Sequence, residues 1–104
     1  MMNANDLVQK MKALRPDSMD VLDLIDEMDN CTMRVWREYI DNDSHDSYYR
    51  IRISGFGDTV CELLPDRVTA TVSGIQLYTV VGGNDDTRMT CGYINTTNWE
   101  VRGE

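Results

Sequence analysis

The spacing of apolar residues changes once along the chain, near residue 30, and this change restricts the fold more than any other feature. Before it, apolar residues recur about every 3.6 positions, which is typical of a helix with one buried side. After it, they alternate with polar residues, which is typical of strands with one buried face. We therefore expect residues 1–30 to be helical and residues 31–104 to be β-rich. Because the chain has 104 residues, both parts are expected to form a single domain.

Two helices are predicted in the first thirty residues. The first follows a candidate N-cap at Asn3 or Asn5, and its apolar residues recur at helical spacing: Leu7, Val8, Met11 and Leu14. Pro16 ends this helix, because proline disfavours helical geometry in the residue before it. A second helix is expected after Asp17 or Ser18, with one apolar stripe: Val21, Leu22, Leu24, Ile25 and Met28.

Short β-rich runs follow, and residues typical of turns separate them. The expected strands cover 31–36, 48–53, 68–73, 76–81, 88–94 and 99–101. The segments between them are polar or rich in glycine: 41–47, 55–58, 64–66 and 82–86. Because strands and helices do not alternate, the predicted fold class is α+β: two N-terminal helices packed on a mostly antiparallel sheet of about five strands. A bend at Ser73–Gly74 would allow an incomplete barrel.

Acidic residues are concentrated between positions 17 and 46. This window holds ten acids and two bases, which accounts for the whole net charge of −8. Five of the acids recur every third residue, so a helix would align them in a slanting ribbon: Asp17, Asp20, Asp23, Asp26 and Asp29. The ribbon is interpreted either as a solvated helix face or as a docking face for a basic partner. The predicted partner-binding acids are Asp20, Asp23, Asp26, Glu27, Asp29, Asp41 and Asp43.

Tyr48, Arg50 and Arg52 form a second candidate binding surface. Alternate residues of a strand point to the same face, so these three side chains are expected to lie together. Exposed tyrosine and arginine are common in the hot spots of protein interfaces. The alternative is that they only cover the exposed side of a sheet.

The sequence lacks a complete catalytic or metal-binding motif. His45 is the only histidine, and the neighbouring aspartates would hold it in the charged form, which is a poor general base. Residues 41–46 resemble the start of a calcium loop, but Asp46 and Arg52 stand where such a loop needs Gly and Glu. The three cysteines include no Cys-x-x-Cys pair. We therefore predict no enzymatic activity, no cofactor and no metal site.

Charge and hydropathy also bear on partners and compartment. No apolar run approaches the roughly 18 residues that a membrane span needs, and the N-terminus lacks the pattern of a secretion signal. An odd number of cysteines favours a reducing compartment. Strong acidity disfavours direct contact with nucleic acid or an anionic membrane. We expect a cytoplasmic protein, in the host cytoplasm if phage-encoded, that binds a basic protein surface and could also form a homodimer.

These features favour a small, acidic, non-catalytic binding protein. The preferred hypothesis is an inhibitor that occludes a basic, nucleic-acid-binding surface of its partner, with mimicry of DNA phosphates as a special form. Proteins of this size and charge are common among inhibitors that phages and mobile elements direct at host defence enzymes, including anti-CRISPR proteins. The alternative is a structural or assembly subunit that oligomerises through sheet edges or through the apolar face of a helix.

Overall fold

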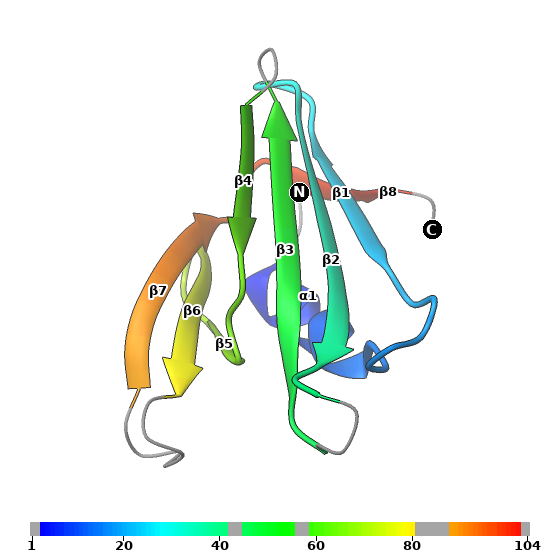
Figure 1. Ribbon diagram of the computed structural model, residues 1–104. Helices are drawn as coiled ribbons and strands as arrows, with labels where there is room; N and C mark the ends of the chain where they lie inside the picture. The colour runs from blue at the N-terminus through cyan, green and yellow to red at the C-terminus, as the bar shows by residue number, and fades with distance from the viewer. Residues whose placement is uncertain (1–2, 42–44, 56–58, 81–87, 103–104) are drawn as a thin grey trace.

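The computed structural model describes residues 3–41, 45–55, 59–80 and 88–102 (Figure 1). In these ranges one helix precedes eight strands: α1 (Ala4–Ala13), β1 (Leu22–Asp26), β2 (Cys31–Tyr39), β3 (Ser47–Gly55), β4 (Thr59–Leu63), β5 (Arg67–Ala70), β6 (Gly74–Val80), β7 (Arg88–Asn95) and β8 (Trp99–Arg102). The α+β class is confirmed, and so is the antiparallel pairing. None of the described residues forms a helix long and apolar enough to cross a membrane.

The strands form two sheets, and the chain passes between them twice, from β4 to β5 and from β7 back to β8. Sheet A has the order β4-β3-β2-β1-β8, and sheet B has the order β5-β6-β7. Between β4 and β5, the Tyr49 N–H donates to the Pro65 carbonyl at 2.8 Å, and the Asp66 N–H donates to the Tyr78 carbonyl at 2.8 Å. The chain therefore leaves the edge of sheet A and enters sheet B at Pro65. Proline is suited to this bend, because it has no N–H to offer to either sheet.

The core lies between α1, the inner face of sheet A and sheet B. Helix α1 contributes Leu7, Val8 and Met11 and packs against β5 and β6. Figure 1 shows α1 behind the strands of sheet A. The strands supply the other large buried side chains: Leu24, Met33, Val35, Tyr49, Ile51, Val68, Ile75, Leu77, Ile94 and Trp99.

The second predicted helix is wrong. Residues 22–26 form β1 instead, which pairs with β2 on one side and with β8 on the other. Leu22 and Leu24 alternate and pack in the core, but Ile25 lies on the opposite face of the strand, so the apolar spacing alone favours a helix. Repulsion between carboxylates three residues apart weakens the helix, whereas the strand gains two neighbours. A turn closes the β1–β2 hairpin, and Asn30 takes a positive φ of 53° there, which asparagine tolerates well.

The strand count also differs from the prediction. The described residues contain a five-stranded and a three-stranded sheet rather than one sheet of about five strands. The sequence pattern predicts a helix where β1 lies and predicts no strand at β4. The predicted segments at 41–47, 55–58 and 82–86 lie partly or wholly outside the described residues.

Candidate functional site

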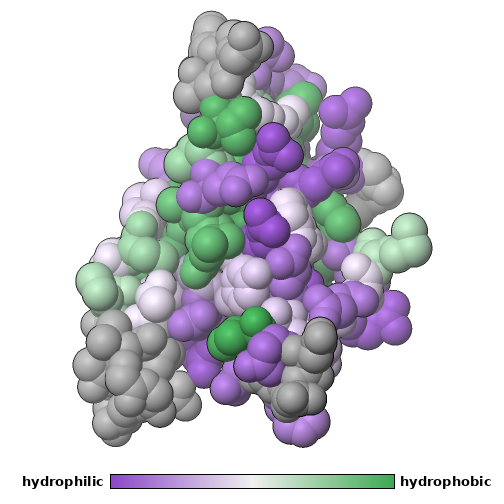
Figure 2. Space-filling view, viewed as in Figure 1, coloured by the Kyte–Doolittle hydropathy of each residue, from purple (hydrophilic) through white to green (hydrophobic). Residues whose placement is uncertain are grey.

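The face of sheet A that points away from the core is the candidate site, and we call it the outer face. Its side chains alternate with the buried ones, and cross-strand neighbours share a face. It carries Asp23, Ile25, Thr32, Arg34, Trp36, Glu38, Tyr48, Arg50, Arg52, Ser54, Val60, Glu62, Glu100 and Arg102. Figure 2 views the molecule from this side and shows hydrophilic side chains along the middle of the sheet.

The carboxylate of Glu38 is the centre of a polar cluster on the outer face. The Trp36 indole Nε1–H donates to Oε1 at 2.8 Å, and the Tyr48 hydroxyl donates to Oε2 at 2.7 Å. Nη1 of Arg50 lies 3.4 and 3.5 Å from the two oxygens. Hydrogen bonds from Trp36 and Tyr48 lower the pKa of Glu38, because they favour the charged carboxylate. The hydrogen bond from Tyr48 to Glu38 raises the pKa of Tyr48, because the phenol must keep its proton to donate.

Arg50 connects this cluster to the edge strand β4. Its guanidinium carbon lies 5.5 Å from the centre of the Trp36 ring, which allows a cation–π interaction. Its Nη2 lies 3.6 Å from a carboxylate oxygen of Glu62. Contacts with Trp36, Glu38 and Glu62 therefore hold one arginine in place. We call Trp36, Glu38, Tyr48 and Arg50 the Glu38 cluster.

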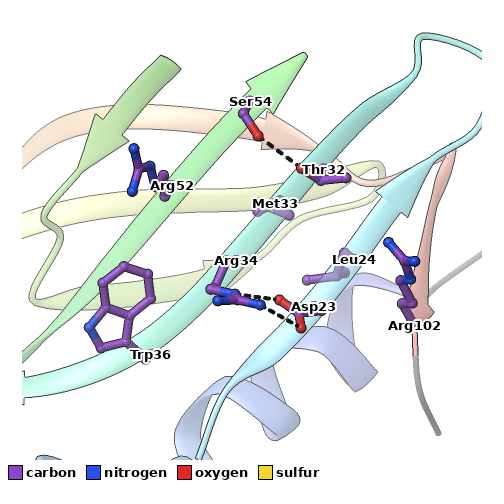
Figure 3. Close-up of a pocket in the computed structure, with 9 residues that line it drawn as sticks. All are labelled: Asp23, Leu24, Thr32, Met33, Arg34, Trp36, Arg52, Ser54 and Arg102. Carbon is purple, nitrogen blue, oxygen red and sulfur yellow. Dashed lines mark hydrogen bonds and ion pairs between the residues drawn. The ribbon is translucent and has the colours of Figure 1, made fainter. Parts of the chain in front are cut away.

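A shallow hollow lies beside the Glu38 cluster (Figure 3). It has a volume of about 540 Å³ and is lined by Asp23, Leu24, Thr32, Met33, Arg34, Trp36, Arg52, Ser54 and Arg102. Arg34 donates two hydrogen bonds to Asp23, at 2.8 and 3.2 Å. The hydroxyls of Thr32 and Ser54 are hydrogen-bonded to each other at 2.9 Å. Three arginines and one acid line the hollow, so it is locally positive.

The outer face as a whole carries no net charge. It holds four arginines, namely Arg34, Arg50, Arg52 and Arg102. It also holds four acids, namely Asp23, Glu38, Glu62 and Glu100. The net charge of −8 therefore belongs to the rest of the molecule.

The predicted acidic ribbon does not exist, because residues 22–26 form a strand and not a helix. Asp20 pairs with Arg15 at 3.0 Å, and hydrogen bonds from Arg15 lower the pKa of Asp20 to about 2. Asp23 is the partner of Arg34 on the outer face. Asp26 is only 5% exposed and accepts the backbone N–H groups of the following turn. Asp23 and Asp26 are three residues apart, so they would lie near each other on a helix, but the strand places them on opposite faces.

The other predicted site residues lie in different parts of the structure, and their role in binding stays a prediction. Glu27, Asp29 and Asp41 are exposed, and Asp43 lies outside the described residues. The placement of Tyr48, Arg50 and Arg52 on one face is confirmed, and their role in binding stays a prediction. Sequence reasoning missed Glu38 and Glu62, which hold these side chains in place. The pattern Trp36-x-Glu38 was the available signal, since alternate strand residues are neighbours on one face.

A second cavity, of about 510 Å³, includes His45 and Tyr49 in its lining. There Arg37 donates to the Leu14 carbonyl at 3.3 Å and to the Ser47 hydroxyl, and its guanidinium packs over the Tyr49 ring. Arg37 thus links the end of α1 to β2 and β3, which is a structural role. Among the described residues, no group of three or more His, Cys, Asp or Glu side chains could hold a metal ion.

Comparison with known proteins adds no assignment. No protein-family model matches the chain, and no curated protein or solved structure is significantly similar to it.

Replacing Glu38 with glutamine is expected to reduce the acid sensitivity of folding. A lowered pKa means that the Glu38 charge stabilises the folded state above the unfolded pKa of about 4.3. This contribution is lost as the pH falls through the lower folded pKa. Urea unfolding at neutral and acidic pH should show a smaller pH-dependent loss in Glu38→Gln than in the wild type. Glu27→Gln, in the exposed turn, serves as the control. Equal pH dependence in Glu38→Gln and the wild type would contradict the role given to this carboxylate.

Proposed function

We propose that the protein is a non-catalytic binding protein and that it contacts another protein through the outer face of sheet A. The Glu38 cluster carries this proposal. Tryptophan, tyrosine and arginine are the residues most enriched in interface hot spots, and here three of them surround one carboxylate. Their mutual hydrogen bonds restrict their rotamers before any partner arrives, which lowers the entropic cost of binding.

Electrostatics support the same surface. The molecule carries −8, yet the outer face balances four arginines against four acids. Near Trp36 the charges are paired, because Arg34 binds Asp23 and Arg50 lies between Glu38 and Glu62. Trp36 and Tyr48 can then be desolvated while the charged groups beside them keep their partners.

An inhibitor that covers a basic, nucleic-acid-binding surface is the second candidate. The net charge supports it, since an acidic protein is steered toward a basic one. Glu27 and Asp29 are also both exposed in the β1–β2 turn. Asp20, Asp23 and Asp26 do not support the inhibitor, because their carboxylates bind groups within the chain. This candidate requires binding that weakens steeply with salt.

Trp36→Ala is expected to weaken binding to a protein partner by about 2 kcal/mol, which is roughly 30-fold in Kd. The test begins with a pull-down from the cells that encode the protein, using the tagged full chain. The captured protein is then purified, and its affinity is measured by calorimetry. Tyr93→Ala is the matched control, because Tyr93 is an aromatic residue that is 45% exposed on sheet B.

Two outcomes would overturn this assignment. One is that Tyr93→Ala weakens binding as much as Trp36→Ala. The other is that Trp36→Ala has no effect while the double variant Glu27→Lys, Asp29→Lys abolishes binding, which would favour the acidic inhibitor and its salt dependence.

A further inference from the structure

One side chain from each strand of sheet A forms a row across the outer face. The register places Arg102 of β8 beside Asp23 of β1, and Asp23 beside Arg34 of β2. It then places Arg34 beside Arg52 of β3, and Arg52 beside Glu62 of β4. Figure 3 shows the first four of these residues around the hollow. Read across the sheet from β8 to β4, the signs of the row are plus, minus, plus, plus, minus.

We infer that the outer face binds a second copy of this chain, related to the first by a two-fold axis parallel to β2. This inference rests on the proposed function and names the partner. Such an axis turns two outer faces toward each other and reverses the order of the row. Arg102 then faces Glu62 of the second copy, and Arg52 faces Asp23 of the second copy. Only Arg34, on the central strand, faces its own equivalent.

The charges of the row are complementary under this symmetry. Four of the five positions meet a charge of opposite sign. The exception, Arg34, is already neutralised by two hydrogen bonds to Asp23 within its own copy. Like charges placed opposite each other would oppose association, and matched charges fix orientation. If the signs of the row were the same in both directions, the two-fold axis would place like charges opposite each other at every position, and the copies would repel.

Two arginines of the row have unused capacity in the single copy. Arg102 forms no ion pair with another described residue. Arg52 reaches a Glu62 oxygen only at 3.9 Å, which is too long for a hydrogen bond. In the two-fold arrangement both face a carboxylate of the second copy.

Trp36 would lie at the centre of the interface. It is on β2, close to the proposed axis, one row along from Arg34. Aromatic side chains at the centre of an interface contribute most of its binding energy, while polar rims contribute less. The indole, ordered by Glu38 and Arg50, is therefore the expected anchor, and the row of charges fixes the orientation.

The size of the face sets the expected strength. Five strands at about 4.8 Å and five residues at about 3.4 Å cover roughly 24 by 17 Å, or about 400 Å² in projection. A standard interface buries about 800 Å² per partner. Because each copy carries −8, long-range repulsion also opposes association. We therefore expect a weak dimer that depends on protein concentration.

Charge reversal tests the inference by sedimentation equilibrium of the full chain, at concentrations up to about 1 mM. Arg102→Glu places two acids opposite each other, and Glu62→Arg places two arginines opposite each other. Each variant alone is expected to weaken dimerisation about tenfold or more. In a mixture of equal amounts, both contacts of the heterodimer become pairs of opposite charge, so association should be restored.

Lys12→Glu is the matched control, because it makes the same change in net charge on the exposed side of α1. It should dimerise like the wild type. Arg102→Gln, which removes a charge without reversing it, provides a milder variant should Glu62→Arg fail to fold; it should weaken dimerisation less than Arg102→Glu. Circular dichroism establishes that each variant is folded.

Three results would overturn the inference: a wild-type chain that stays monomeric at about 1 mM, folded variants that stay monomeric when mixed, or a Lys12→Glu variant as weak as Arg102→Glu. If the wild type is monomeric while Trp36→Ala still weakens binding to another protein, the inference fails and the proposed function stands. If both effects are absent, both fail.

Discussion

Replacing Met11 with alanine should lower the free energy of unfolding by about 2–5 kcal/mol. Met11 is fully buried at 0% exposure in the last turns of α1, and α1 packs on β5 and β6. The alanine leaves a cavity that the surrounding strands can fill only in part. Since a domain of this size is stable by roughly 5–15 kcal/mol, this loss is a large fraction of the total. Urea unfolding followed by circular dichroism measures it.

Met19→Ala is the matched control, because it removes the same atoms from a side chain that is 97% exposed. Its effect should stay within about 0.5 kcal/mol. Equal losses in the two variants would mean that α1 does not pack against the sheets as described.

Replacing Asp26 with alanine should cost about 1–3 kcal/mol of stability. Its carboxylate is 5% exposed and accepts the Met28 N–H at 3.0 Å and the Asp29 N–H at 3.2 Å. These bonds fix the turn that joins β1 to β2, and β1 in turn holds β8 in sheet A. Without the carboxylate, the Met28 and Asp29 N–H groups lose their acceptor, and no side chain holds the turn in its conformation.

Asp29→Ala separates this structural role from a role of the acids in docking. The Asp29 side chain is exposed in the same turn, so its removal should change stability by no more than about 0.5 kcal/mol. If Asp26→Ala proves as stable as the wild type and weakens partner binding instead, Asp26 belongs to a docking surface after all.

The sequence predicted the elements whose signals are local. Helix α1 has its apolar stripe and a side-chain cap, in which Asn3 accepts the Asn5 N–H at 2.8 Å. It ends at Ala13, shortly before Pro16. Strands β2 and β3 are nine residues each and have one buried face, and this alternation fixes which side chains lie on that face.

Strand β1 could not be predicted in the same way, because its stability depends on neighbours that are distant in sequence. The spacing of its apolar residues favours a helix, and the strand forms because it pairs with β2 and with β8, at the other end of the chain. The turn after it did leave a signal, an aspartate that accepts backbone N–H groups followed by Asn30 at positive φ. Such residues are typical of turns rather than of a helix interior.

In the candidate site, too, local features were predictable from the sequence and features that depend on strand pairing were not. The sequence predicted that Tyr48, Arg50 and Arg52 share a face, since this follows from alternation within one strand. It could not predict that Glu38 and Glu62 hold Arg50, because cross-strand neighbours depend on register. The error on the acidic ribbon arose from the same cause as the error on β1.

The central claim, that the outer face is where a protein binds, can be tested on the two indole N–H signals in the NMR spectrum of ¹⁵N-labelled protein. The chain has two tryptophans: Trp36 lies on the outer face, and Trp99 is 8% exposed in the core. On titration with the protein partner, or with increasing concentration if the partner is a second copy, the Trp36 signal should shift while the Trp99 signal stays in place. A Trp36 signal that does not move at saturation would contradict the claim.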